Sequence, residues 1–362
     1  MKLQKRKKIL FVRHFGLISN LGDQLISKAT EEYLLELSNS EEFHYTTASF
    51  VPYTKFGKYN FINLVKGFLF SLKQAMKADH IVIIGGNLII PNNTKFSLCF
   101  FFYFLLSKIF QTKFSTFGVG VSLSKGSKTW RNWLYKKALL AADYIGVRDE
   151  HSLNALPTVM EDSNFLSKGN VHLSHDCAFL FKDKYFCQTN ESNKVAVIPV
   201  NYHSATCNES VIALSESEYL DFHVNLMSAM ISKGMKPFLL CTDKTDEIFA
   251  EKINQKLNLK IITPESVDEL FVLLSSANVV AARMHGIIAS LLAGRFVVAL
   301  NWQHKVKSLS EKELLSFSCF DFEDKSITLI LAKLAESNSI NKSDMLKLTD
   351  DLCADLKTVI KL

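Results

Sequence analysis

One stretch of the sequence constrains the fold more than any other, namely residues 278–301, which read NVVAARMHGIIASLLAGRFVVALN. A short β-branched run ends at Arg283-Met284-His285-Gly286, an apolar segment with helical character follows, and a second strand-like run ends at Leu300. Alternating strand and helix signals of this kind predict a βαβ unit whose strands are parallel neighbours in one sheet. The stretch therefore predicts an α/β fold.

The same alternation of strand and helix signals continues along the chain in two series. In the first series we expect an amphipathic helix over residues 23–37 and strands over residues 8–14, 80–84, 114–121 and 144–147. In the second we expect a closing helix over residues 344–360 and strands over residues 195–200, 237–241, 259–262, 279–282 and 296–300. A polar, irregular stretch near residues 187–193 separates the series. Two Rossmann-like domains with parallel sheets are therefore predicted, residues 1–188 and 194–362, with a substrate cleft between them.

Composition narrows the class of protein. A length of 362 residues suits two domains. The sequence contains no run of 18 uncharged apolar residues, so we predict no transmembrane helix. The basic start is followed by only four apolar residues, which predict a strand and not a secretory signal. Seven cysteines without a CxxC pair fit reduced thiols in the cytoplasm. A net charge of +6 favours anionic partners but does not indicate nucleic acid.

Arg283 and His285 follow a predicted strand directly. In parallel sheets ligands bind beyond the carboxyl ends of the strands, and a helix N-terminus there favours anions. A permanent cation and a titratable imidazole two residues apart would suit an anionic ligand. The alternative is an arginine paired with a carboxylate and a histidine packed into the start of a helix, and an isolated R-x-H motif does not decide between them.

Asn20-Leu21-Gly22-Asp23 lies between the first predicted strand and the first predicted helix. Gly22 permits an unusual backbone angle, and Asn20 or Asp23 can cap the helix. In a functional role, the carboxylate of Asp23 would face the cleft and accept a proton from a substrate hydroxyl. Both interpretations remain open on the sequence alone.

Three further motifs stand at the ends of predicted strands. Gly85-Gly86-Asn87 either forms a turn or lets a ligand approach the backbone, and Gly118-Val119-Gly120 is likewise too short for the G-x-G-x-x-G fingerprint of a dinucleotide site. Arg148 precedes Asp149 and Glu150, with which a surface ion pair of little energetic worth is the simple interpretation. Its planar guanidinium would otherwise suit a carboxylate or phosphate.

Two segments invite functions that their patterns do not support. His172 and His175 would point to opposite faces of a strand, so we predict no metal site there and expect Asp176 to cap a turn. The segment 97–106, SLCFFFYFLL, is too short to cross a bilayer and is predicted to be a buried helix. A membrane-surface patch is the alternative for that segment.

Taken together, these residues resemble the polysaccharide pyruvyl transferase family over most of the chain. The resemblance rests on the spacing of N-x-G-D at residues 20–23, Gly85-Gly86, Gly118 and Gly120, Arg148 followed by Ser152, the segment 176–179, R-x-H-x-x-x-A from Arg283 with Gly294, and Lys305. The chain departs from the family at Asn87, where a third glycine is common, and at Cys177, where a proline is common. The charged positions are retained.

The resemblance implies a glycosyltransferase-B-like arrangement of the two domains, with the acceptor on the N-terminal side and the donor on the C-terminal side. It also implies transfer of pyruvate from phosphoenolpyruvate to two hydroxyls of a hexose in a cell-surface polysaccharide or its precursor, which forms a cyclic ketal. Arg148, Arg283 and Lys305, with Gly286 beside them, would bind the donor without a metal or other cofactor. His285 is the candidate general acid, since its reference pKa lies near neutrality, and Asp23 the candidate for the hydroxyl proton. The other cleft residues would be Asn20, Gly22, Gly85, Gly86, Asn87 and Gly118.

Two alternatives and one extension stay open. A nucleotide-sugar-dependent glycosyltransferase would share the fold and the basic site but bind a nucleoside diphosphate. A non-catalytic scaffold in envelope polysaccharide assembly would keep only the fold. A lipid-linked acceptor would explain the basic N-terminus and the aromatic segment, with a cytoplasmic enzyme held peripherally at the inner face of the membrane by contacts that salt weakens.

Overall fold

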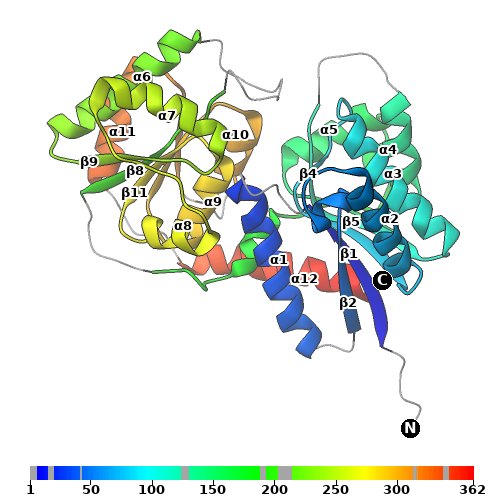
Figure 1. Cartoon of the computed structure of the whole chain (residues 1–362). Helices are drawn as coiled ribbons and strands as arrows, with labels where there is room; N and C mark the ends of the chain where they lie inside the picture. Colours follow the sequence, from blue (N-terminus) through cyan, green and yellow to red (C-terminus); the bar gives the residue numbers. More distant parts are fainter. Residues whose placement is uncertain are drawn as a thin grey trace. The chain divides into compact units, whose positions relative to one another are not determined.

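The computed structural model describes residues 6–14, 20–40, 43–123, 130–187, 193–202, 214–312, 315, 317–336 and 342–362. Every predicted strand is present, with bounds within two residues of those predicted, and the helices predicted over residues 23–37 and 344–360 are present as well. The predicted α/β class with two parallel sheets is therefore confirmed (Figure 1).

The chain divides into two compact units. Unit 1 comprises Met1–Leu17, Ile26–Leu180 and Asp350–Leu362, and unit 2 comprises Ile18–Leu25 and Phe181–Thr349. The division differs in three places from the single cut expected between residues 188 and 194. A specific contact among the described residues accounts for each difference.

The first difference concerns residues 181–187, where the ring of Tyr185 stacks on Phe271 with a centroid distance of 3.8 Å and its hydroxyl donates to Asp268 at 2.6 Å. The second concerns the start of the first helix, where the Leu21 N–H donates to the carbonyl of Thr242 at 2.9 Å. The third is the end of the chain, which the Lys7 ammonium holds by donating to the Ile360 carbonyl at 2.8 Å. These contacts join segments far apart in sequence, so no local sequence pattern predicts them.

Unit 1 is built on a parallel sheet with the order β2-β1-β3-β5-β6-β7, and β4 pairs with β5 beside it. Its strands are β1 (Lys7–Arg13), β2 (Phe43–Ser49), β3 (His80–Ile84), β4 (Asn87–Ile89), β5 (Lys113–Val121), β6 (Tyr144–Val147) and β7 (Val171–Leu173). β3 reads HIVII and is buried throughout, as expected of an inner strand covered on both faces. The strands β2, β4 and β7 were not predicted, because they lie at or beside the edge of the sheet and their sequences lack a continuous apolar run.

The helices of unit 1 cover both faces of its sheet. They are α1 (Leu21–Ser40), which begins in unit 2 and enters unit 1 at Ile26, α2 (Phe61–Ala75), α3 (Thr94–Ile109), α4 (Trp130–Leu140) and α5 (Glu150–Met160). Short 3-10 turns lie at Pro52–Phe56, Phe165–Lys168 and Cys177–Phe181. Contacts run from α2 to α3, from α3 to α4 and from α4 to α5, so these four form one layer. The helix α1 lies on the other side of the sheet (Figure 1).

Unit 2 is built on a second parallel sheet with the order β10-β9-β8-β11-β12-β13. Its strands are β8 (Lys194–Ile198), β9 (Lys236–Leu240), β10 (Ile261–Ile262), β11 (Asn278–Ala281), β12 (Val297–Leu300) and β13 (Ser318–Phe320). Counted from its own first strand, the order is 3-2-1-4-5-6, which is the order of Rossmann folds. The order reverses between β8 and β11, and a switch point of this kind is where such sheets bind ligands.

The helices of unit 2 also form two layers, as judged from their mutual contacts. One layer holds α6 (Glu216–Ser232), α7 (Lys244–Leu257) and α11 (Asp324–Glu336), and the other holds α8 (Val267–Leu274), α9 (Met284–Leu292) and α10 (His304–Ser310). The last helix is α12 (Lys342–Lys361), which begins in unit 2 and ends in unit 1. No helix in the described parts of the chain is long and apolar enough to cross a membrane.

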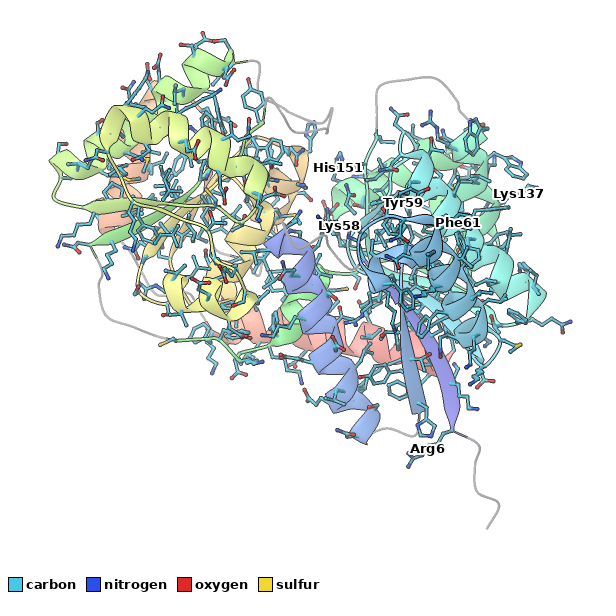
Figure 2. All side chains as sticks on the ribbon, viewed as in Figure 1. Arg6, Lys58, Tyr59, Phe61, Lys137 and His151 are labelled. Carbon is cyan, nitrogen blue, oxygen red and sulfur yellow. The ribbon has the colours of Figure 1, made fainter. Side chains whose placement is uncertain are left out.

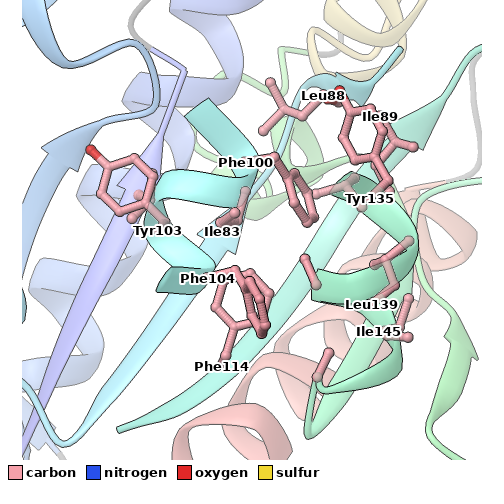
Figure 3. Close-up of a cluster of buried hydrophobic side chains, with 14 of the residues drawn as sticks. Ile83, Leu88, Ile89, Phe100, Tyr103, Phe104, Phe114, Tyr135, Leu139 and Ile145 are labelled. Carbon is pink, nitrogen blue, oxygen red and sulfur yellow. Dashed lines mark hydrogen bonds between the residues drawn. The ribbon is translucent and has the colours of Figure 1, made fainter. Parts of the chain in front are cut away.

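The aromatic segment 97–106 lies within α3 and supplies much of the core of unit 1. Phe100, Tyr103 and Phe104 are buried; Phe100 and Phe104 pack with Phe114, and Phe100 also packs with Tyr135 (Figure 3). The Tyr135 hydroxyl donates to the Leu88 carbonyl at 3.0 Å, which satisfies the one polar atom of a buried ring. The predicted buried helix is therefore confirmed for this segment.

Candidate functional site

The carboxyl edge of the sheet in unit 2 gathers polar side chains from four strand ends. Asn201 follows β8, Asp246 follows β9, Arg283 follows β11 and Gln303 follows β12. Because the strands are parallel, these ends share one edge, and the switch point between β8 and β11 lies in its middle. We regard this edge as the candidate functional site.

The centre of the site is an ion pair between Arg283 and Asp246. The Nε and Nη2 atoms of Arg283 donate to the two carboxylate oxygens of Asp246 at 2.8 and 2.6 Å. The Asn201 N–H donates to the same carboxylate at 2.9 Å. The Asp246 side chain is fully buried, whereas that of Arg283 is 23% exposed. Burial would lower the pKa of Arg283, but the hydrogen bonds and charge of Asp246 outweigh it and raise that pKa, so the guanidinium is always charged.

This geometry leaves part of the guanidinium available. Nη1 of Arg283 makes no hydrogen bond to any residue that the structure describes. The carboxylate therefore fixes the plane of the guanidinium while one N–H edge remains for an anion. The alternative that Arg283 pairs with a carboxylate is confirmed, and the pairing is compatible with binding.

His285 lies in the first turn of α9 and packs against the backbone of Gly22. A Cβ atom added at Gly22 would stand 2.2 Å from Nδ1 of His285, closer than any real contact. Gly22 does not have the positive φ that we expected to explain it. The glycine is required instead because the imidazole occupies the space where a side chain would stand.

Asn20 joins the first helix to this site. Its side-chain oxygen accepts hydrogen bonds from the N–H groups of Gly22 at 2.8 Å and Asp23 at 3.4 Å, so the predicted cap is confirmed for Asn20. Asn20 also forms an antiparallel bridge with Asp243, the residue that caps α7. The N-x-G-D motif therefore belongs to unit 2 and not to the N-terminal domain where we expected it. Asp23 lies in the first turn of α1 and is partly exposed.

The segment after β12 lies beside the start of α9. The indole N–H of Trp302 donates to the Ala282 carbonyl at 2.8 Å, immediately before Arg283. Nζ of Lys305 lies 5.8 Å from the centroid of the Trp302 ring. Gly286 has a packing role, because an added Cβ would stand 2.9 Å from Ile198. Arg283, His285 and Lys305, together with Asn20, Gly22 and Asp23, thus belong to one unit.

Sequence reasoning missed three residues of this site, Asn201, Asp246 and Gln303. Asp246 follows the helix cap Asp243 in T-D-K-T-D, a pattern that looks like ordinary capping, and its partner is 37 residues away. Gln303 is 1% exposed, and among the described residues neither its amide oxygen nor its amide nitrogen has a hydrogen-bond partner. Buried amides without hydrogen-bond partners are rare, because each one lowers the free energy of unfolding. Gln303 therefore lowers the stability of unit 2 in exchange for placing a polar group at this edge.

Arg148 lies at the corresponding edge in unit 1, after β6. It donates to Asp149 at 3.1 Å and to Asp176 at 3.3 Å, and its side chain is 4% exposed. The expected surface pair of little worth is therefore wrong, because the pair is buried and has a second carboxylate. Burial would lower the pKa of Arg148, but Asp149 and Asp176 outweigh it and raise that pKa.

Gly120 makes room for the guanidinium of Arg148, and Gly118 makes room for the neighbouring Cys177. A Cβ added at Gly120 would stand 2.8 Å from Cζ of Arg148, and one at Gly118, whose φ is +60°, would stand 2.6 Å from Sγ of Cys177. Gly85 and Gly86 also have positive φ and form the turn between β3 and β4. Asn87 starts β4 and donates to the Ser122 hydroxyl at 2.7 Å. These glycine motifs therefore serve turns and close packing within unit 1.

Two other polar features of unit 1 have simple explanations. His172 stacks on Tyr144 with a centroid distance of 4.3 Å, and Asp176 accepts a hydrogen bond from the Ala178 N–H at 3.0 Å, which confirms the predicted turn cap. A cavity of about 230 Å³ lies at the amino ends of β1 and β2 and is lined by Lys8, Ile9, His44, Thr46, Gln74, Lys77 and Ala78. It is at the opposite edge of the sheet from Arg148 and is not part of the candidate site.

Two doubly wound parallel sheets, one of them with a charged site at its switch point, define the class as a two-unit Rossmann-like protein. Solved structures share this fold. HepE from Anabaena, in complex with UDP and glucose, matches with a TM-score of 0.60 and 11% identity over 99% of this chain and 100% of its own. UDP-GlcNAc 2-epimerase from Methanocaldococcus jannaschii matches with a TM-score of 0.56 and 10% identity over 96% and 99%. Both are glycosyltransferase-B-like enzymes.

The sequence profile of the polysaccharide pyruvyl transferase family matches residues 20–304. The chain belongs to that family, and the resemblance drawn from its motifs is confirmed. The matched range begins at Asn20 and ends at His304, so it contains both Gly22 and His285. No curated protein matches the sequence.

Proposed function

We propose that this protein transfers pyruvate from phosphoenolpyruvate to two hydroxyls of a saccharide in a cell-surface polysaccharide or its precursor, which forms a cyclic ketal. Membership in the pyruvyl transferase family supports the reaction class. The observation that carries the donor assignment is Arg283, whose guanidinium is fixed by Asp246 and keeps Nη1 open beside the His285 segment.

The reaction needs two kinds of proton transfer. The enol methylene of the donor gains a proton, which makes the adjacent carbon electrophilic. One acceptor hydroxyl adds to that carbon and loses its proton, phosphate leaves with the electrons of its carbon–oxygen bond and takes up a proton, and the second hydroxyl adds and loses its proton. Two protons are consumed and two are released, so the site requires an acid and a base but no oxidant.

Arg283 and Lys305 are the proposed donor ligands. Phosphoenolpyruvate carries a carboxylate and a phosphate, and the open N–H edge of Arg283 suits either group. Lys305 follows Trp302, which is tied by its indole to the β11–α9 turn, so the ammonium approaches the same edge as a compact charge. Arg148 is left out of this donor set, because its guanidinium is buried and already binds Asp149 and Asp176.

His285 is the proposed general acid, and Asp23 is the proposed acceptor of the hydroxyl proton. His285 packs on Gly22 at the start of α1, and Asp23 is the next residue along that helix. The contact between the R-x-H and N-x-G-D motifs therefore supports a shared role, which neither motif supports alone. A positioned acid of this kind contributes about 10²–10⁴-fold to the rate.

A nucleotide-sugar-dependent glycosyltransferase is the second candidate. HepE shares the fold and its structure holds UDP and glucose. At 11% identity this likeness concerns the fold, so it supports the alternative less than the family match supports pyruvyl transfer. The two candidates differ in their donor, which can be tested without knowing the acceptor.

The test is a thermal-shift titration with phosphoenolpyruvate, UDP and GDP as separate ligands. A ligand that binds only the folded protein raises the unfolding temperature once its concentration exceeds Kd. We expect a shift with phosphoenolpyruvate that Arg283→Lys abolishes, because lysine cannot supply the fixed fork. His285→Gln should retain the shift and lower turnover by about 10²–10⁴-fold, measured as phosphate release with a saccharide acceptor.

Arg148→Lys is the matched control, since it makes the same substitution in a buried arginine of unit 1. It should keep the shift with phosphoenolpyruvate. A shift with UDP or GDP and none with phosphoenolpyruvate would replace the proposal by the glycosyltransferase. Full turnover in His285→Gln would remove the general-acid assignment and leave the donor assignment standing.

A further inference from the structure

Helix α2 exposes a continuous apolar stripe. Its exposed side chains are Phe61 at 76%, Ile62 at 64%, Val65 at 40%, Phe68 at 37%, Leu69 at 60%, Leu72 at 40% and Met76, just past its end, at 59%. At about 100° per residue these positions fall within an arc of roughly 120° on the helix. Tyr59, which precedes the helix, is 69% exposed and lies near Phe61 and Lys58 (Figure 2).

The orientation of this stripe is fixed by the opposite side of the helix. A Cβ added at Gly67 would stand 2.3 Å from the carbonyl oxygen of Pro52, so α2 sits directly on the preceding turn. Ser71 is buried and hydrogen-bonded to the Tyr103 hydroxyl at 3.0 Å, and Ala75 is buried as well. The helix therefore cannot rotate to bury its apolar stripe without losing these contacts.

The exposed apolar surface continues from α2 onto α3. The rings of Phe68 and Phe102 meet edge to face at 4.8 Å, which joins the two helices along the stripe. Leu98, Leu105 and Ile109 continue on α3, with exposures of 50%, 41% and 65%. At helical spacing these three residues share one face.

The surface then passes from α3 to α4. Phe101 lies 5.8 Å from the Trp133 ring, measured between centroids. Trp130, Trp133 and Leu140 are 56%, 52% and 47% exposed. We call the exposed side chains of these three helices the α2–α4 face. Soluble monomers rarely expose apolar side chains over three adjacent helices, so this face is expected to have an occupant.

The segment that contains α2, α3 and α4 is strongly basic, which indicates an anionic occupant. Residues 52–140 contain thirteen lysines and arginines and one acidic residue, whereas the rest of the chain contains 29 basic and 35 acidic residues. The whole positive balance of the protein therefore comes from this segment. Lys66, Lys73 and Lys77 are exposed at the border of the apolar stripe of α2, and Lys137 is exposed on α4 near Trp133 (Figure 2).

We propose that the α2–α4 face docks the protein on the surface of an anionic lipid bilayer. An apolar stripe bordered by lysines, with tryptophan and phenylalanine beside it, is the pattern of helices that lie in the membrane interface. The apolar side chains enter the region below the headgroups, and the lysines contact anionic headgroups.

This surface differs from the one expected from sequence. Most of the segment 97–106 lies in the core, and its exposed large apolar side chains are Leu98 and Leu105. The stripe on α2 carries most of the exposed apolar area instead. Docking does not depend on the proposed transfer reaction, but it would hold the enzyme where a lipid-linked saccharide is presented.

The experiment is sedimentation of the full chain with vesicles of phosphatidylcholine alone or mixed with phosphatidylglycerol. We expect binding to the mixed vesicles only, and release at high salt. The triple variant I62Q/L69Q/M76Q should weaken vesicle binding by at least about tenfold, because three apolar side chains no longer leave water. The triple variant K66Q/K73Q/K77Q should weaken it by roughly fivefold for each lysine.

Matched controls carry the same substitutions elsewhere. L35Q/I248Q/V272Q alters three helix side chains that are 55%, 58% and 69% exposed, and K233Q/K236Q/K260Q alters three exposed lysines of unit 2. Both controls should bind vesicles like the natural chain, and every variant should keep the thermal shift with phosphoenolpyruvate. Absence of binding to mixed vesicles at low salt would overturn the proposal. So would a dimer in solution that only I62Q/L69Q/M76Q dissociates, since the face would then bind a second copy.

Discussion

The two units each hold an ion-paired arginine at the carboxyl edge of a parallel sheet, but the two arginines are in different states. Arg148 binds two carboxylates and is 4% exposed, whereas Arg283 binds one described carboxylate, that of Asp246, and is 23% exposed. Gly120 closes against the guanidinium in unit 1, while Nη1 of Arg283 makes no hydrogen bond within the described chain. The same residue type therefore completes an internal network in one unit and is held open in the other.

The difference shows why a strand-end arginine is ambiguous in a sequence. Both follow a strand with the same local signal, and their roles depend on how many carboxylates the fold brings to them. A buried ion pair is not by itself evidence of stabilisation, because desolvation offsets the attraction. Removing one partner is nevertheless costly, since it leaves the other charge buried.

The largest expected effect comes from removing each arginine. Arg148→Met should lower the free energy of unfolding by about 3–5 kcal/mol, because two buried carboxylates lose their partner. Arg283→Met should have an effect of similar size through the fully buried Asp246. Differential scanning calorimetry of the two variants measures both.

Variants without charge then separate the two roles. Arg148→Met/Asp149→Asn/Asp176→Asn should regain stability and keep turnover, because asparagine still accepts the capping hydrogen bonds from Ser152 and Ala178. Arg283→Met/Asp246→Asn should be more stable than Arg283→Met alone, but phosphoenolpyruvate should no longer raise its unfolding temperature. If the stable unit 1 variant loses turnover, Arg148 contacts substrate and the comparison between the two arginines fails.

A smaller effect concerns acid stability, to which each unit contributes one buried histidine. Burial lowers the pKa of His80 in unit 1 to about 3 and that of His223 in unit 2 to about 4. The unfolded chain therefore takes up the proton first, near pH 6.5, so stability is complete above that value and falls as the solution is acidified. Each histidine should reduce the free energy of unfolding by about 2 kcal/mol at about pH 5 relative to neutral pH.

His80→Gln and His223→Gln test this one unit at a time, by calorimetry over the acidic range. Each variant should lose its share of the acid dependence. The contribution of His80 should continue to grow below pH 4, where that of His223 has levelled off, because its folded-state pKa is the lower one. An unchanged pH profile in both variants would assign the acid dependence to other groups.

The smallest expected effect is a gain in stability at Gln303. Gln303→Met replaces a buried amide that has no partner among the described residues, so it should raise the free energy of unfolding by about 1 kcal/mol. Gln303→Ala should lower it, since it also removes the packing. A lower unfolding temperature in Gln303→Met, measured without ligand, would mean that the amide is satisfied in the folded protein.

Much of the fold could be predicted from the sequence because its signals are local. The buried strands are continuous apolar runs, and the alternation with helices requires parallel pairing. That pairing already places Arg283 and His285 at a ligand-binding edge, and Asn20 is recognisable as a helix cap. The spacing of these motifs also identified the family.

Only the tertiary structure decided which distant residues meet. Three contacts join segments that share no periodicity. Arg283 pairs with Asp246, His285 packs on Gly22, and Asn20 forms a bridge with Asp243 in unit 2. Exposure is decided in the same way, since α2 and α3 are both apolar and differ in how much of each faces the core. Periodicity and capping act within about one or two helical turns, whereas partners and burial depend on strand order, which no short stretch of sequence contains.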